Sequence, residues 1–265
     1  MPGALIAAAL ACAPVPGLDL LKPETVRVLW FGEIHGTNEQ PKMFGDIVCA
    51  LSARRGPIVV VLERGASELP AWSRYMMSPG TRKDRLQLTA GGLWTDRLQD
   101  GRSSQAMLML AERLRRLSQA GRIEAIRFSI DARPSHAPGP YEQSMGEAVE
   151  RAATEHRGAL VLALSGNGHA RRTTNQIGET TYRLAANYVP GMVSIDIESG
   201  PGLAWNCQMP TCGPHSLGSM PLHPRGIAKA PPDSDFDLVA STGSRTTASR
   251  PARGAGKPVK LDLKS

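Results

Sequence analysis

The 265-residue sequence is poor in aromatic residues and lacks the motifs that mark several large enzyme families. Phe, Trp and Tyr make up 5% of the chain, so few residues are available to line a slot for a large planar ligand. No Gly-x-Gly-x-x-Gly fingerprint follows the first predicted strand and no Walker-type lysine occurs, which argues against a nucleotide-binding fold. The absence of a Gly-x-Ser-x-Gly motif argues against a serine hydrolase of the α/β-hydrolase type.

The positive charge of the chain is concentrated near its carboxyl end. The formal net charge is +7, and residues 245–265 contain six basic residues and one acidic residue. This short segment, rich in Ser, Thr, Pro and Gly, is typical of a solvated terminus, so residues 244–265 are predicted to form a basic, disordered tail. Because the remaining body is close to neutral, we do not expect a nucleic-acid partner.

The amino-terminal residues 1–20 are apolar and contain the small-residue sequence Ala11-Cys12-Ala13. This pattern resembles an export signal, although it lacks the usual positive start, and it predicts an exported, periplasmic or secreted protein. The alternative is an apolar arm that docks on the body. The run is too short to span a membrane, and contact with a membrane is expected only if Cys12 is acylated.

The four cysteines predict one disulfide. Cys207 and Cys212 lie close together in a Pro- and Gly-rich stretch and could close a small loop, as suits an exported protein. Cys49 falls in a helical pattern and is interpreted as a small buried residue. A zinc site made of Cys207, Cys212 and His215 is less favoured because it offers only three ligands.

Apolar runs and helical patterns alternate along residues 21–243, which we interpret as one domain. Strands are predicted at residues 26–31, 57–62, 123–130, 159–164 and 192–197, with a last edge strand at 236–241. Helices are predicted at residues 41–54, 104–120, 141–156 and 180–188, and residues 66–100 have an irregular helical pattern. This alternation predicts an α/β fold with a mainly parallel β-sheet flanked by helices.

The sequence repeats one short motif, Gly-x-x-His, directly after two of the predicted strands. The first motif runs from Gly32 to His35 and the second from Gly166 to His169. Other polar residues that follow predicted strands are Glu33, Glu39, Glu63, Arg64, Asp131, Arg133, Asn167, Asp196 and Glu198. The carboxyl ends of parallel strands share one edge of the sheet, where ligands bind in open α/β sheets. We therefore predict a composite site at the strand carboxyl ends.

The predicted catalytic residues are Glu33, His35, Glu63 and His169. His35, His169 and Glu33 could hold a divalent metal with an open position for water. Alternatively, the carboxylates and histidines could act directly as general base and acid. Arg64 is expected to orient a carboxylate or to stabilise developing negative charge. Glu39 and Asn167 are expected to support the site, and structural roles are assigned to His136, His156, His215 and His223.

Three segments carry a resemblance to a known superfamily. Residues 31–39 (Phe-Gly-Glu-Ile-His-Gly-Thr-Asn-Glu), residues 60–64 (Val-Val-Leu-Glu-Arg) and residues 164–169 (Leu-Ser-Gly-Asn-Gly-His) resemble the superfamily of Tiki proteases, TraB/PrgY proteins, ChaN-like haem-binding lipoproteins and erythromycin esterases. The resemblance covers residues 25–200. It departs from the erythromycin esterases in that the first histidine follows its glycine by three positions rather than four.

The resemblance implies an α/β core with its site at the strand carboxyl ends, but its members differ in activity. They include metal-dependent proteases, metal-independent esterases and haem carriers. The leading hypothesis is a hydrolase of ester or amide bonds in a small-molecule or peptide substrate. The alternative is a haem- or iron-binding protein, in which Trp72, Tyr75, Met76 and Met77 either line a haem slot or pack a helix. A third reading is a scaffold that keeps the site residues without activity.

Overall fold

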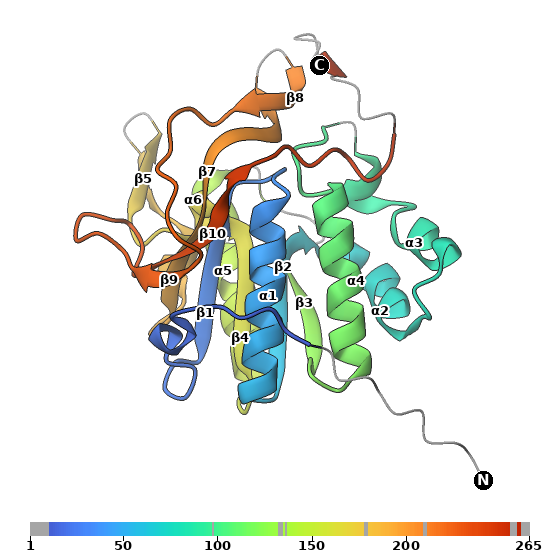
Figure 1. Ribbon diagram of the computed structural model, residues 1–265, viewed down its shortest axis with the longest axis horizontal. Helices are drawn as coiled ribbons and strands as arrows, with labels where there is room; N and C mark the ends of the chain where they lie inside the picture. Colours follow the sequence, from blue (N-terminus) through green and yellow to red (C-terminus); the bar gives the residue numbers. More distant parts are fainter. Residues whose placement is uncertain are drawn as a thin grey trace.

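The computed structural model describes residues 11–96, 98–131, 135, 137–177, 180–208, 211–254 and 259–260. Its centre is a nine-stranded sheet (Figure 1). The strands of this sheet are β1 (Val28–Glu33), β2 (Ile58–Gly65), β3 (Ala125–Ile130), β4 (Leu160–Gly166), β7 (Val193–Gln208), β8 (Thr211–Ser216), β9 (Gly226–Lys229), β10 (Leu238–Thr246) and β11 (Val259–Lys260). They follow the order β11-β8-β7-β1-β4-β2-β3, with β10 paired to both β7 and β9.

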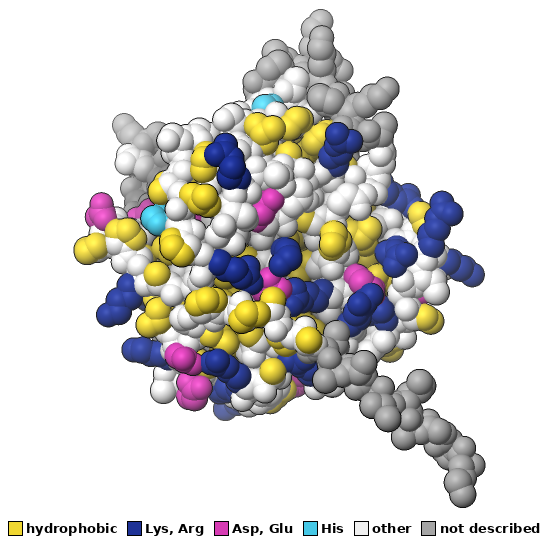
Figure 2. Space-filling view, in the orientation of Figure 1, with side chains coloured by type: hydrophobic (Ala, Val, Ile, Leu, Met, Phe, Trp, Pro, Cys, Tyr) yellow, Lys and Arg dark blue, Asp and Glu magenta, His cyan; other side chains and the backbone are white. Residues whose placement is uncertain are grey.

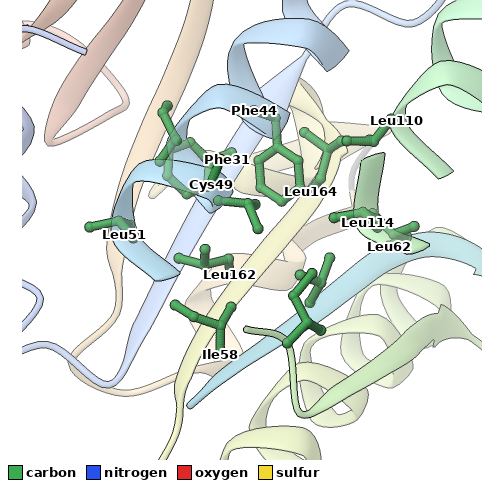
Figure 3. Close-up of a cluster of buried hydrophobic side chains, with 14 of the residues drawn as sticks. Phe31, Phe44, Cys49, Leu51, Ile58, Leu62, Leu110, Leu114, Leu162 and Leu164 are labelled. Atoms are coloured by element: carbon green, nitrogen blue, oxygen red, sulfur yellow. The ribbon is translucent and has the colours of Figure 1, made fainter. Parts of the chain in front are cut away.

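The helices cover both faces of the sheet. They are η1 (Leu18–Leu21), α1 (Glu39–Arg54), η2 (Ala66–Glu68), α2 (Leu69–Met77), α3 (Arg82–Leu88), η3 (Gly92–Thr95), α4 (Gln105–Gln119), α5 (Pro138–Glu155), α6 (Asn167–Ala170) and η4 (Ala185–Tyr188), where η denotes a 3-10 helix. α1, α2 and α4 contribute to the apolar core on one face, whereas α5 and η4 pack against the other (Figure 1). The first core contains Phe31 against Phe44, with ring centroids 5.4 Å apart (Figure 3).

The centre of the sheet is parallel, as the sequence predicted. β1 lies between β4 and β7 and is parallel to both, and β2 pairs in parallel with β4 and β3. The register places Glu33 beside Gly166 and Gly32 beside Asp196. The carboxyl ends of these strands therefore meet at one edge, and the predicted α/β fold class is confirmed.

Two secondary-structure predictions beyond residue 170 were wrong. Residues 180–188 do not form a helix, because β6 (Thr180–Arg183) pairs with β5 (Thr174–Ile177) in an antiparallel hairpin before η4 begins. Thr180, Thr181 and Tyr182 are β-branched or aromatic residues that favour strands over helices. The strand predicted at 236–241 is not at the edge, because β10 has β7 on one side and β9 on the other.

Residues 244–254 do not form the predicted disordered tail. β10 extends to Thr246, and residues 247–252, which we call the strap, cross the beginnings of α1 and α4 (Figure 1). Backbone hydrogen bonds hold the strap in place although its composition is polar. Ser249 is fully buried. Basic side chains are spread over the face of the body that carries α1 and α4 (Figure 2). Residues 255–258 and 261–265 lie outside the described residues.

The segment that begins at residue 11 packs against the body. Leu18 and Leu21 are buried, and the Ile227 N–H donates to the Pro16 carbonyl at 2.8 Å. Cys12 is bonded to Cys49, so Cys49 is not simply a small buried residue and Cys12 presents no free thiol for acylation. The first half of the export signal predicted for residues 1–20, residues 1–10, lies outside the described residues.

The predicted disulfide between Cys207 and Cys212 is present, at the turn between β7 and β8. With both cysteines bonded to each other, the less favoured zinc site with His215 loses its two thiolate ligands. No helix among the described residues is both long enough and apolar enough to cross a membrane.

Candidate functional site

The two Gly-x-x-His turns meet at the carboxyl ends of β1 and β4. His35 lies two residues beyond the end of β1, and His169 lies on α6, which directly follows β4. Gly166 lies close to the first histidine, because a Cβ atom at this position would lie 3.0 Å from Nε2 of His35, tighter than an ordinary contact. The Gly166 N–H also donates to Oε2 of Glu63 at 2.7 Å. The glycine of the second motif therefore allows the histidine of the first to approach the end of β4.

Glu63, at the end of β2, is the centre of the site. Its Oε2 lies 3.4 Å from Nε2 of His35, and its Oε1 lies 3.9 Å from Nε2 of His169. Oε1 also accepts a hydrogen bond from Nη1 of Arg102 at 2.9 Å. The Glu63 side chain is 5% exposed, so these groups, together with the Gly166 N–H, compensate a carboxylate that is largely removed from water. Two imidazoles and one guanidinium thus share a single carboxylate.

Glu33 and Glu63 hold His35 in its charged form. Nδ1 of His35 lies 2.8 Å from Oε1 of Glu33, so a carboxylate oxygen faces each ring nitrogen. Burial alone would lower the pKa of His35, but the charges and hydrogen bonds of Glu63 and Glu33 outweigh it and raise the pKa to about 10. His35 is therefore an imidazolium at neutral pH.

Glu63 is the matching anion of this cluster. Burial opposes its ionisation, yet His35, His169 and Arg102 hold the pKa of Glu63 well below its usual range. The resting site therefore contains a buried ion pair between Glu63 and His35.

Glu142 on α5 orients the second histidine. Its Oε1 lies 2.7 Å from Nδ1 of His169, and its Oε2 accepts the Ala185 N–H at 2.8 Å. With Nδ1 engaged in this way, Nε2 of His169 faces Glu63 and the site. Burial lowers the pKa of His169, but Glu142 and Glu63 together raise it above the ordinary value.

Arg102 and Asp100 belong to the site but were missed by sequence reasoning. Nε of Arg102 donates to Oδ2 of Asp100 at 2.9 Å, while Nη1 reaches Glu63. Burial raises the pKa of Asp100, but the guanidinium outweighs it and the net shift is downward. Both residues lie in the loop before α4, in a region without any motif, so only the fold could reveal them.

Tyr141 and Glu142 were also missed. The Tyr141 ring centroid lies 5.8 Å from that of His169, and burial together with the charge of Glu63 raises the pKa of Tyr141 to about 12. The phenol is therefore neutral at physiological pH. Both residues lie in the first turns of α5, the helix that follows β3. Extending the search for strand-end residues into the next helix would have found them.

The sequence suggested that Arg64 faces the Glu63 carboxylate, but in the structure it does not. Its guanidinium is fully buried beside Trp72 and Trp94, 5.2 and 4.3 Å from the ring centroids. It pairs with Glu68, and its Nη1 donates to the backbone carbonyl of Arg102 at 2.7 Å. Arg64 therefore supports the loop that carries Arg102 and has no direct contact with the central carboxylate.

The other predicted site residues lie at or beyond the margin of the site. Glu39 accepts the Thr247 N–H at 2.9 Å and so holds the strap. Asn167 starts α6, where its Cα packs against Gly32. Asp131 is exposed. Asp196 is a separate acid, and burial and the nearby charge of Glu198 raise its pKa to about 7. Arg133 and His136 lie outside the described residues.

The described histidines outside the two motifs have local partners. His156 contacts Glu124 and Arg127, and His215 contacts Asn206 and Thr211. His223 lies 3.9 Å from Glu198 and is more than half exposed. Local contacts of this kind match the structural roles expected from the sequence.

The site residues do not fit the metal centre considered for His35, His169 and Glu33. Each ring nitrogen of His35 faces a carboxylate oxygen, Nδ1 at 2.8 Å from Glu33 and Nε2 at 3.4 Å from Glu63, whereas a metal ligand needs a free lone pair. Among the residues that the structure describes, no group of three or more His, Cys, Asp or Glu side chains is arranged to hold a metal ion. We derive no chemical step through a metal.

The residues considered for a haem slot pack mainly into the core. Trp72, Tyr75 and Met76 on α2 are buried, and the Trp72 ring packs edge-on against Phe128. Met77, at the end of the same helix, is exposed. The arrangement corresponds to the helix-packing alternative for these residues.

The sequence matches no family model and no curated protein, but the fold resembles several solved structures. A mutant of erythromycin esterase EreC in its open conformation aligns with a TM-score of 0.61 and 11% identity, over 91% of this chain and 94% of that one. A Bacillus cereus protein aligns with a TM-score of 0.58 and 14% identity, over 89% and 94%. The type III effector HopBA1 aligns with a TM-score of 0.52 and 15% identity, over 91% and 99%. The resemblance predicted from the sequence motifs thus holds at the level of architecture: this chain shares its fold with erythromycin esterase.

Proposed function

We propose that the chain is a hydrolase of ester or amide bonds that activates water with histidine and glutamate side chains. One observation carries the proposal: His35 and His169 face the two oxygens of Glu63, and each has a second carboxylate of its own. The two imidazoles differ in how closely Glu63 approaches Nε2, at 3.4 Å for His35 and 3.9 Å for His169. Environments that differ in this way allow one histidine to act as a base while the other remains charged.

His169 is the general base in this proposal. Glu142 holds Nδ1, which leaves the Nε2 lone pair directed into the site. Nε2 removes a proton from water while the water oxygen attacks the substrate carbonyl carbon. The carbonyl electron pair moves to its oxygen, which becomes an oxyanion. When the carbonyl re-forms, the bond to the leaving group breaks and the leaving group takes the proton from His169.

His35 and Arg102 supply positive charge for the oxyanion. Both side chains are 21% exposed, so part of each remains accessible from solvent. Their contacts with Glu63, Glu33 and Asp100 hold them in place before substrate binds. Pre-oriented charges of this kind stabilise a transition state without a cost for reorganisation.

The fold comparison supports ester chemistry, because one of the similar structures is an erythromycin esterase. We extend the proposal to a small-molecule or peptide substrate. The Cys12–Cys49 and Cys207–Cys212 disulfides support function in an oxidising compartment, as in an exported protein.

Turnover of a substrate panel tests the proposal. The purified chain is assayed with p-nitrophenyl acetate and butyrate, a simple lactone, erythromycin and peptide p-nitroanilides. We expect hydrolysis of at least one substrate, with about 10²-fold or greater loss in His35→Ala and His169→Ala. His223→Ala is the matched control, because this histidine is exposed outside the site. The proposal is overturned if the wild-type chain hydrolyses none of these substrates, or if both site variants hydrolyse them as fast as the wild type. A Soret band on haem titration would favour the haem-binding alternative.

A further inference from the structure

The strap joins the two halves of the site through one buried residue. The Ser249 N–H donates to the carbonyl of Gly36 at 2.7 Å, and the Ser249 hydroxyl accepts the Ala106 N–H at 2.9 Å. Gly36 directly follows His35, and Ala106 lies in the first turn of α4, four residues beyond Arg102. Ser249 is 0% exposed, so neither bond competes with solvent. The backbone N–H and the hydroxyl of Ser249 thus connect the His35 turn to the helix that follows the Arg102 loop.

The His35 turn depends on contacts from outside its own strand. Gly36 has φ of +78°, a backbone conformation that favours glycine, and a Cβ atom there would lie 1.8 Å from the Trp205 carbonyl oxygen. The Gly36 carbonyl accepts hydrogen bonds from Trp205 at 2.8 Å and from Ser249 at 2.7 Å. The position of the His35 backbone is therefore set jointly by β7 and the strap.

The Arg102 loop rests directly on this turn. A Cβ atom on Gly101 would lie 2.2 Å from the Gly36 nitrogen and 2.7 Å from the His35 carbonyl carbon, so the two backbones are in contact. The strap fixes the far end of the same loop, because Gln105 N–H donates to the Arg250 carbonyl at 2.8 Å and Ser249 receives Ala106 N–H. A helix start with its N–H groups satisfied in this way has a fixed position.

We infer that Ser249 is a positioning residue for the catalytic site, setting the spacing between His35 and Arg102 around Glu63. Glu63 depends on this spacing because it receives both His35 and Arg102. A small shift of either partner changes the balance of charge that keeps His35 protonated. The activity part of this inference rests on the proposed function, whereas the charge state of His35 can be measured without turnover.

The test compares three variants with the wild-type chain. Ser249→Ala removes the hydroxyl and keeps the backbone amide. Ser249→Thr restores a hydroxyl. Arg250→Ala is the matched control from the same strap. The Arg250 side chain is exposed, and its contact with the Gln105 N–H is made by the backbone carbonyl, which the substitution keeps. The first measurement is the His35 pKa by NMR titration of the imidazole, and the second is kcat and KM on the best substrate of the panel.

We expect Ser249→Ala to lower the His35 pKa and to reduce kcat by about 10-fold with little change in KM, because misplacement of catalytic groups acts on the chemical step. Ser249→Thr recovers most of both losses, and Arg250→Ala shows neither. Ser249→Cys, a near-isosteric variant with a weaker acceptor, replaces Ser249→Ala if that variant does not fold, and it shows smaller losses in the same direction. An unchanged His35 pKa in the folded Ser249 variants overturns the inference. If the wild-type chain shows no turnover, the proposed function fails and the NMR titration still decides the role of Ser249.

Discussion

Glu142 binds Nδ1 of His169 through one carboxylate oxygen at 2.7 Å and the Ala185 amide through the other at 2.8 Å. A buried carboxylate that is fixed at both oxygens can hold an imidazole in a single tautomer and orientation. Glu142 comes from α5 and His169 from α6, so the pair links two elements that are separated by β4 in the sequence. His35 has a similar partner in Glu33, but its Nε2 lies 3.4 Å from Glu63, whereas Nε2 of His169 lies 3.9 Å away, so His169 is the histidine better prepared to accept a proton.

The Glu142→Gln variant tests this assignment. The glutamine removes the negative charge and can present an N–H to Nδ1, which favours the wrong tautomer. We expect kcat to fall by about 10²-fold or more, within the range attributed to general base catalysis. Glu147→Gln, an exposed position on the same helix, serves as the control and retains full activity. Equal activity of both variants would show that His169 is not the base.

The pH profile of kcat/KM should be bell-shaped. The base must be neutral, so activity rises with pH as His169 loses its proton, and this limb lies above the ordinary value of 6.5 because the pKa of His169 is raised. The charged His35 must keep its proton, so activity falls again as the pH passes about 10. In Glu142→Gln the lower limb should move to lower pH. A rate that rises through pH 10 without a maximum would contradict the role of the His35 imidazolium.

Replacing Arg102 by lysine should impair catalysis although the charge is kept. The guanidinium binds Glu63 through Nη1 and Asp100 through Nε, a two-sided contact that an ammonium group cannot reproduce. We expect kcat/KM to fall by about 10- to 100-fold. Arg116→Lys on α4, which pairs with Glu112 at the surface, is the control. If Arg102→Lys keeps wild-type activity, positive charge alone suffices and the oriented contact is unimportant.

The sequence predicted the parallel sheet and the central site residues because both follow from local patterns. Apolar runs such as residues 57–62 identify buried strands, and the parallel arrangement brings the residues after those strands to one edge. Glu63, His35 and His169 were found by this rule. The rule identifies which residues meet, but it does not predict which partner each one takes.

The remaining site residues depend on contacts over long stretches of sequence. Arg102 reaches Glu63 across 39 residues, and the Ala106 amide reaches Ser249 across 143 residues. Neither Arg102 nor Ser249 directly follows a predicted strand. The strap was predicted to be a disordered tail because its composition is polar, whereas its order comes from backbone hydrogen bonds that composition does not reveal. Arg64 shows a related limit, since a residue next to Glu63 in sequence points to Glu68 and the Arg102 carbonyl instead.

The two disulfides should differ in their contribution to stability. Cys12 and Cys49 are 37 residues apart, whereas Cys207 and Cys212 are 5 apart. The loop-entropy relation gives about 4 kcal/mol for the long loop and about 2 kcal/mol for the short one. Denaturant unfolding of the Cys12→Ala/Cys49→Ala and Cys207→Ala/Cys212→Ala double variants checks this order. Equal losses of unfolding free energy would indicate that loop entropy does not dominate.

Exhaustive chelation should leave hydrolysis unchanged. His35 is paired with carboxylates at both ring nitrogens, and His169 has Nδ1 bound to Glu142, so the two imidazoles are engaged in an acid-base network. We expect full activity after dialysis against EDTA, and metal content by elemental analysis well below one equivalent in the wild type and in a His35→Ala/His169→Ala double variant. About one equivalent of metal that is lost in the double variant, with activity lost on chelation and restored by that metal, would replace the acid-base assignment with a metal-dependent mechanism at the same residues.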